Sequence, residues 1–233
     1  NYESGFRFVL GKTTKTLNNE WLNYYKTRYT KEELDKKLPV QEKIELRRKK
    51  SRGEVFQYKV HPYGTKIAYV SNDLGKYKVW IYDIDKKKYT KVLKRGFKVD
   101  RETDMTQPVI TWSPNGDALA YTEEHEGVVQ LSIYNVDAKE TTTRTLMGLS
   151  KVLDLAYNHA GNKMVFSALK KGQTDLFYYN MVGNSYKQLT DDIYDDLNPQ
   201  FIENSNKIIF SSNRKNDSLL KDIEVKPYNY NYD

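Results

Sequence analysis

Cysteine is absent from the 233 residues, which excludes disulfide bonds and thiolate metal sites. No apolar run approaches the roughly 18 residues of a membrane-spanning helix, so no membrane span is predicted. The three histidines, His61, His125 and His159, lack the spacing of the HExxH motif that holds zinc in peptidases. A GxSxG nucleophile elbow is also missing. We therefore predict no catalytic residue, no metal ligand and no cofactor in these residues.

The positive charge is concentrated at one end of the chain. Residues 1–52 contain 14 Lys and Arg against 7 Asp and Glu, and the remaining residues contain 24 of each kind. A neutral remainder makes nucleic acid an improbable partner, because phosphate binding needs a clustered basic surface. The basic run Arg47, Arg48, Lys49 and Lys50 is interpreted as a solvated linker. RNA, an acidic partner or anionic lipid headgroups are the alternatives for this run.

One segment of the sequence recurs four times. It begins with a tight turn that contains a glycine, continues into an apolar strand, and ends in a second turn and a second strand. The anchor residues are Gly64, Gly116 and Gly161, with Ser205 in the same place in the fourth copy. Spacings of 52, 45 and 44 residues between them indicate a repeat architecture.

Each repeat has the pattern of four short antiparallel strands, which is one blade of a β-propeller. We predict an all-β fold, a partial β-propeller of three to four four-stranded antiparallel blades, preceded by a short α-helical segment. The expected blades are residues 54–98, 106–147, 150–190 and 195–233, the last one incomplete, with a further strand possible at SLLKDIEV. Three and a half blades do not close a ring, so the rest of a longer chain, or else another chain, is expected to complete it.

Residues 1–39 are expected to be helical, and residues 40–53 to be a basic linker. Leu17, Trp21 and Tyr24 recur at helical spacing on one face. Thr16 is the predicted N-cap of this helix, which should end near Tyr29. The capping-box sequence Thr30 to Glu33 predicts a second, short helix that ends at Pro39.

The fourth repeat carries a family resemblance. Leu189-Thr190, the Asp-rich loop, Pro199, Phe201 and Ser212-Asn213-Arg214 closely resemble the blade signature of TolB-like propellers, the WD40-like PD40 repeat. Trp112 to Gly116 is similar to the turn of the same signature. His61, Asn158-His159-Ala160 and Ser205 depart from it, which is expected to weaken individual turns. The resemblance implies a protein-docking scaffold of the cell envelope in a diderm bacterium, periplasmic or associated with the outer membrane, with an unidentified protein partner.

A second resemblance covers residues 5–29 and rests on Gly11, Lys12, Leu17 and Trp21. These residues look like the end of a gluzincin-type metallopeptidase domain, and the blades also resemble the front domain of prolyl-oligopeptidase-like enzymes. The alternative function is therefore an accessory propeller of a peptidase, whose catalytic residues would lie outside this chain.

Three clusters of charged residues could carry chemistry. Asp191, Asp192, Asp195 and Asp196 could offer oxygen ligands to Ca²⁺, but a structural loop is the preferred interpretation. The cluster Glu123 to Glu126 is expected in a solvated hairpin loop. Asn213-Arg214 is expected to make hydrogen bonds in turns and between blades. The motif itself assigns no binding residue.

Overall fold

The computed structural model describes residues 2–33, 44, 46, 53–99 and 104–214. These residues fall into two units, one before Leu46 and one from Leu46 onward. The basic run at 47–50, the predicted helix end at Pro39, the SLLKDIEV segment and the C-terminal tail all lie outside the described residues. Among the described helices, none is both long enough and apolar enough to cross a membrane.

The part of the first unit that the structure describes contains two helices, α1 (Tyr2–Leu10) and α2 (Thr14–Glu33). The prediction of Thr16 as the N-cap is wrong, because Thr13 Oγ1 accepts the hydrogen bond from Thr16 N at 3.2 Å. The predicted helix boundary at Thr30 is also wrong. Thr30 lies inside α2, and its hydroxyl donates to the Lys26 carbonyl one turn earlier at 2.5 Å, so the side chain is not a cap.

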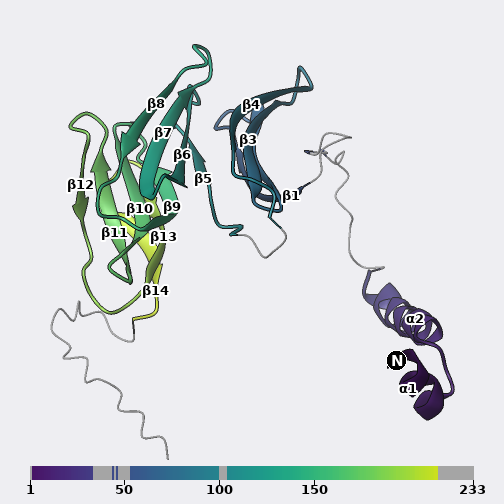
Figure 1. The fold of residues 1–233 in the computed structure, drawn as a ribbon. Coiled ribbons are helices and arrows are strands. Elements are labelled where there is room, and N and C mark those ends of the chain that lie inside the picture. Colours follow the sequence, from purple (N-terminus) through teal and green to yellow (C-terminus); the bar gives the residue numbers. More distant parts are fainter. Residues whose placement is uncertain (1, 34–43, 45, 47–52, 100–103, 215–233) are drawn as a thin grey trace, which may run out of the picture. The chain divides into compact units, whose positions relative to one another are not determined.

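The second unit is built of β-strands, as predicted (Figure 1). In its described residues, three sheets have four strands each, in the order β1-β2-β3-β4, β5-β6-β7-β8 and β9-β10-β11-β12, and a fourth sheet pairs β13 with β14. All strand pairs are antiparallel, and neighbours in each sheet are consecutive in the chain. This is the up-and-down topology of propeller blades. The prediction of a partial β-propeller after a short helical segment is therefore confirmed.

The strand bounds follow the repeat. Blade 1 contains β1 (Glu54–Val60), β2 (Lys66–Asp73), β3 (Lys76–Asp83) and β4 (Lys88–Arg95). Blade 2 contains β5 (Val109–Trp112), β6 (Ala118–His125), β7 (Val128–Asn135) and β8 (Thr141–Thr145). Blade 3 contains β9 (Lys151–Tyr157), β10 (Lys163–Lys170), β11 (Gln173–Asn180) and β12 (Ser185–Gln188). Blade 4 contains β13 (Asp196–Phe201) and β14 (Ile208–Ser212).

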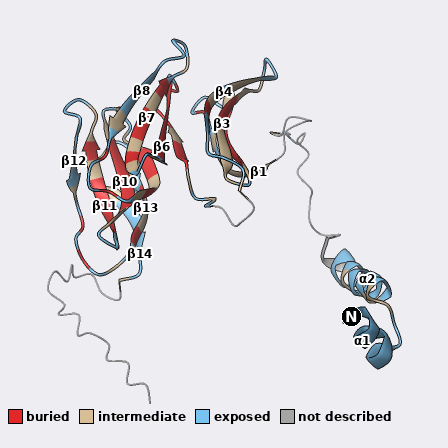
Figure 2. Ribbon diagram, in the orientation of Figure 1, coloured by how far each residue is buried: buried red, intermediate tan, exposed pale blue. Residues whose placement is uncertain are grey.

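The second strand of each of the first three blades is almost fully buried (Figure 2). It lies mid-sheet and has apolar residues on both faces, which is the pattern of a strand covered on both sides. Two apolar clusters result, one shared by blades 1 and 2 and one shared by blades 2 and 3. Blades therefore bury their faces against one another, as repeat units do.

The anchor turns close in the same way in all four blades. The residue at the anchor position donates its N–H to the carbonyl three residues earlier, at 2.8 Å for Gly64 and 3.1 Å for Ser205. Gly116 has a φ of +74°, where glycine avoids the steric cost of a Cβ. In the fourth blade the left-handed residue is Asn204, with φ +55°, one position before Ser205. Asn tolerates this region, so the turn forms without its glycine.

Candidate functional site

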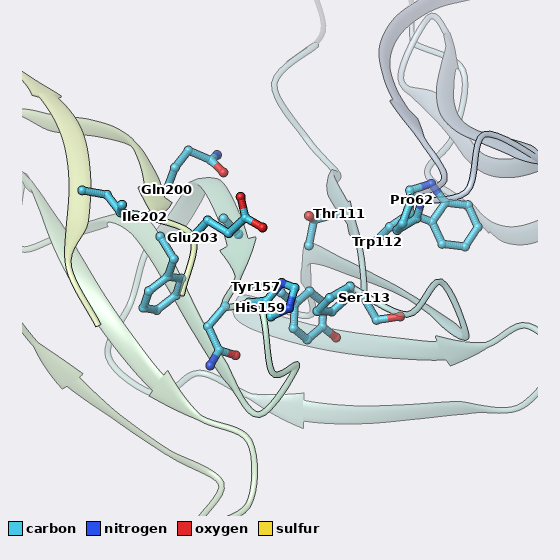
Figure 3. A pocket seen from close by; sticks show the side chains of 13 residues that line it. Pro62, Thr111, Trp112, Ser113, Tyr157, His159, Gln200, Ile202 and Glu203 are labelled. Atoms are coloured by element: carbon cyan, nitrogen blue, oxygen red, sulfur yellow. The ribbon is translucent and has the colours of Figure 1, made fainter. Parts of the chain in front are cut away.

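A cavity of about 320 Å³ opens where the anchor turns of the blades converge (Figure 3). The first strands of the blades are neighbours, since β5 contacts both β1 and β9, and β9 contacts β13. These strands are therefore the innermost ones, and the cavity lies at one end of the axis around which the blades are arranged. We call it the axial cavity. Its lining comes from four blades: Pro62, Thr111, Trp112, Ser113, Pro114, Ala156, Tyr157, Asn158, His159, Gln200, Phe201, Ile202 and Glu203.

The turns that frame the axial cavity are fixed by their own side chains. Ser113 Oγ donates to Asp117 Oδ1 at 2.8 Å and accepts from the Ala118 N–H at 2.9 Å. Asn158 takes over the second role in blade 3, because its Oδ1 accepts from the Lys163 N–H at 2.9 Å. Asn158, which departs from the signature, therefore keeps the side-chain hydrogen bond that closes its turn.

His61 uses the same position differently, to connect blade 1 to blade 2. Its Nε2 lies 3.1 Å from the Gly116 carbonyl, and its ring meets the Trp112 ring edge to face at 4.9 Å. A carbonyl can only accept, so Nε2 carries a proton, and Nδ1 accepts from the Tyr63 N–H at 3.2 Å. Trp112 Nε1 donates to the Lys59 carbonyl at 3.0 Å. These contacts hold the blade 1 side of the cavity in place.

Tyr157 lines the axial cavity and also a second cavity of about 310 Å³ between blades 2 and 3. Burial, reinforced by the negative charge of Asp117, raises the pKa of the Tyr157 phenol well above its usual value. The phenol therefore stays neutral and can offer both a hydroxyl and an aromatic face. The two cavities share Ser113, Pro114 and His159, so they form neighbouring parts of one turn-lined surface.

The chemistry of this surface suits binding. A serine, a histidine and an aspartate, the residue types of a hydrolase triad, are present on this surface. Ser113 Oγ, however, donates its hydrogen bond to Asp117 within its own turn and not to a histidine. Within the described ranges, no group of three or more His, Asp or Glu side chains could hold a metal ion. Aromatic, amide and proline side chains with a few polar groups are the usual lining of a recognition site.

The Asp-rich loop has an internal cation instead of open ligand positions. Arg214 forms a two-pronged pair with Asp196, at 2.8 and 2.7 Å, and its Nη2 also lies 2.5 Å from Asp192. Both carboxylates are fully buried. Asp195 N donates to the Asn213 side-chain oxygen at 3.0 Å. The prediction that Asn213-Arg214 bonds within turns agrees with these contacts. They join the loop between β12 and β13 to the residues that follow β14.

The predicted solvated loop at Glu123 to Glu126 is wrong for its first member. Glu123 lies in β6 and is only 2% exposed. Its carboxylate accepts from the Tyr77 hydroxyl at 2.9 Å and lies 3.8 Å from Arg95 Nε. Both partners belong to blade 1. The hairpin starts later than the charge pattern suggests, because β6 continues to His125.

The histidines are divided between the two ends of the strands. His61 and His159 lie at the turn end, next to or within the axial cavity lining. His125 ends β6 at the opposite end, 3.8 Å from Glu126. They do not form one site.

Sequence reasoning did not identify Tyr157, Gln200 or Glu203 as candidate binding residues. Each lies within five residues of an anchor turn, and this position relative to the turn is the sequence feature that could have identified them. Nothing in the sequence indicates that Asp175 is a buried carboxyl group with a shifted pKa. It is 1% exposed in β11, and burial, together with the nearby negative charge of Asp191, raises its pKa to about 6.

The protein-family model PD40, described as TolB beta propeller domain, matches residues 62–226. A search of curated protein sequences gives no match. Among solved structures, TolB from Acinetobacter baumannii is similar over 68% of this chain and 37% of its own, with 18% identity and a TM-score of 0.54.

Two further solved structures are similar in fold. A protein assigned as TolB from Agrobacterium tumefaciens matches over 66% of this chain and 53% of its own, with 18% identity and a TM-score of 0.53. A protein assigned as a dipeptidyl aminopeptidase IV from Bacteroides ovatus matches over 66% of this chain and 29% of its own, with 15% identity and a TM-score of 0.50. The chain thus spans between about a third and a half of the length of these structures, and at these identities the similarity concerns the fold.

Proposed function

Since the chain belongs to the TolB beta-propeller domain family, we propose that its blades are a non-catalytic protein-interaction scaffold of the bacterial cell envelope. The proposed location is extracytoplasmic, in the periplasm or at the outer membrane of a diderm bacterium. The family membership supports both parts of the proposal.

The axial cavity is the observation that carries the binding role. Side chains from four blades line it, and its polar groups are amides, hydroxyls, one imidazole and one carboxylate. A volume of about 320 Å³ is at the lower end for ligand pockets. It fits one or two side chains of a partner's extended segment, while the surrounding turns would contact the rest of that partner.

The test is capture of partners from envelope extract with three forms of the chain. The wild type is compared with His159→Ala/Gln200→Ala at the cavity, and with Glu124→Ala/Gln173→Ala at the opposite end of the strands. All four side chains are exposed, so folding should be unchanged, which circular dichroism checks. A partner retained by the wild type and the control pair but lost by the cavity pair supports the proposal. Equal capture by all three forms contradicts it.

The second candidate function is an accessory propeller of a peptidase, and α1 and α2 favour it. In the described part of this unit no side chain is buried, and Phe8, Val9 and Trp21 are 92%, 75% and 59% exposed. A pair of helices with these apolar side chains exposed is not a self-sufficient domain, because the side chains need another surface to cover them. That agrees with the proposal that residues 1–39 end an upstream domain.

The sequence of the parent gene upstream of residue 1 decides this second candidate. An HExxH motif there would support a metallopeptidase domain. An upstream region without that motif, together with a downstream region without a serine-hydrolase domain, would reject it.

A further inference from the structure

Among the described residues that line the two cavities of the turn surface, Asp and Glu occur but Lys and Arg do not. Glu203 lines the axial cavity and Asp117 lines the neighbouring one. The described linings of the two cavities therefore carry carboxylates without a basic side chain, although the blades as a whole are neutral.

Glu203 differs from Asp117 in what its oxygens do. Asp117 accepts hydrogen bonds from Ser113 and Asn115, one on each oxygen, at 2.8 and 2.9 Å. Glu203 is exposed on the β13–β14 turn, and within the part of the chain that the structure describes its carboxylate has no hydrogen bond or ion pair. Figure 3 shows its side chain pointing into the cavity on the same side as Gln200. A carboxylate in this position is available to a cation from outside.

Aromatic rings lie in the same lining. Tyr157, Trp112 and Phe201 come from three different blades and border the cavity. An ammonium or guanidinium group is attracted to the face of such a ring and to a carboxylate beside it. An anionic side chain of a partner would gain neither interaction.

Lys59 is a charge that works against this attraction, so its position matters. It lies on β1, one of the innermost strands, and is half-buried. Its positive charge acts on Asp154 of β9, where it opposes the rise in pKa that burial causes. The two charges offset each other along the inner strands, outside the lining of the axial cavity.

We propose that the axial cavity binds the side chain of a lysine or arginine in an extended segment of the partner protein, with Glu203 as the ionic contact and the bordering rings as the apolar contact. This inference rests on the proposed scaffold function and specifies the chemistry of the partner. Glu203 and the rings act together, because the ion pair alone is exposed and contributes little.

The test uses three capped pentapeptides with the sequence Ala-Gly-X-Gly-Ala, where X is arginine, its neutral analogue citrulline, or glutamate. Binding to the full chain is followed by NMR through the indole N–H of Trp112 at low salt. The arginine peptide should bind about tenfold more tightly than the citrulline peptide, and the glutamate peptide should bind more weakly still. Adding salt to about 0.5 M should reduce the arginine advantage several-fold.

Two variants with the same change in charge locate the effect. Glu203→Gln should weaken binding of the arginine peptide about twofold to fivefold and leave binding of the citrulline peptide unchanged. Glu124→Gln, about 20 Å away along the strands of blade 2, should leave both unchanged. Equal binding of the arginine and citrulline peptides, no binding of any peptide, or equal losses in the two variants would overturn the inference. The scaffold proposal fails separately, when no partner is lost from the cavity variant in the capture experiment.

Discussion

Replacing Gly116 by alanine should destabilise the contact between blades 1 and 2 more than any other anchor glycine substitution. A Cβ at this position would lie 2.1 Å from His61 Nε2 and 2.4 Å from His61 Cε1. The φ of +74° adds roughly 1–2 kcal/mol for any L-residue. Because the imidazole is buried, it must move away and lose its own contacts.

The magnitude follows from those contacts. The hydrogen bond from His61 Nε2 to the Gly116 carbonyl is worth about 0.5–1.5 kcal/mol, and the edge-to-face contact with Trp112 is worth a similar amount. With the backbone cost, Gly116→Ala should lower the free energy of unfolding by about 2–5 kcal/mol. Urea denaturation followed by tryptophan fluorescence measures this difference.

Gly64→Ala is the matched control. Gly64 occupies the same position in blade 1 with a φ of +69°, and a Cβ there would have nothing within 4 Å. It should cost only the backbone term of about 1–2 kcal/mol. In a His61→Ser background, the cost of Gly116→Ala should fall to the same value, because the imidazole that the new Cβ would meet is absent. Equal costs for the two glycine substitutions in the wild-type background would refute the assigned role of His61.

Three other substitutions test the polar contacts between and within blades. Arg214→Ala should lower the stability of blade 4 by about 3–5 kcal/mol, because it leaves two fully buried carboxylates without their cation; hydrogen exchange of β13 and β14 measures the loss, and unchanged protection would contradict it. Tyr77→Phe should cost about 1–3 kcal/mol by removing the hydroxyl that donates to buried Glu123, and a thermal shift matching an exposed tyrosine variant would argue against this. Asp175 has its pKa raised to about 6 by burial, so its protonated form is favoured in the folded state. The stability that this group contributes is fully present below about pH 4 and is lost as pH rises through 6. At pH 7.5 the free energy of unfolding of Asp175→Asn should therefore exceed that of the wild type by about 1–2 kcal/mol, after allowance for screening. At pH 4 the two free energies should differ little. A pH-independent difference in denaturation midpoints would show that Asp175 does not titrate in this range.

The fold could be predicted because its signals are local. An apolar run between a glycine turn and a second turn specifies a buried strand, as at Lys66–Asp73, and the recurrence of this pattern specifies a blade. The limits of α2 do not follow from the local pattern alone. Thr30 satisfies the capping-box pattern, yet nothing in the preceding residues breaks the helix, so α2 continues through it.

The candidate site depends on contacts between blades, which sequence spacing does not contain. His61 departs from the family signature at its own turn, and only the packing of blade 2 shows that its ring reaches Gly116. Glu123 has the sequence context of a loop, but the neighbouring blade supplies Tyr77 as its partner. The residues that line the axial cavity could be identified only once the contacts between the first strands of neighbouring blades were known. Those contacts exist only between assembled blades.

The central claim is that partners dock at the axial cavity. A photo-crosslinking residue placed at His159, at the cavity, tests this most directly, with the same residue at Gln173, at the opposite end of the blade 3 strands, as the control. Both side chains are exposed. The account predicts a discrete cross-linked protein from position 159 in envelope extract, and none from position 173. Cross-linking to the same protein from both positions, or from position 173 alone, would contradict it.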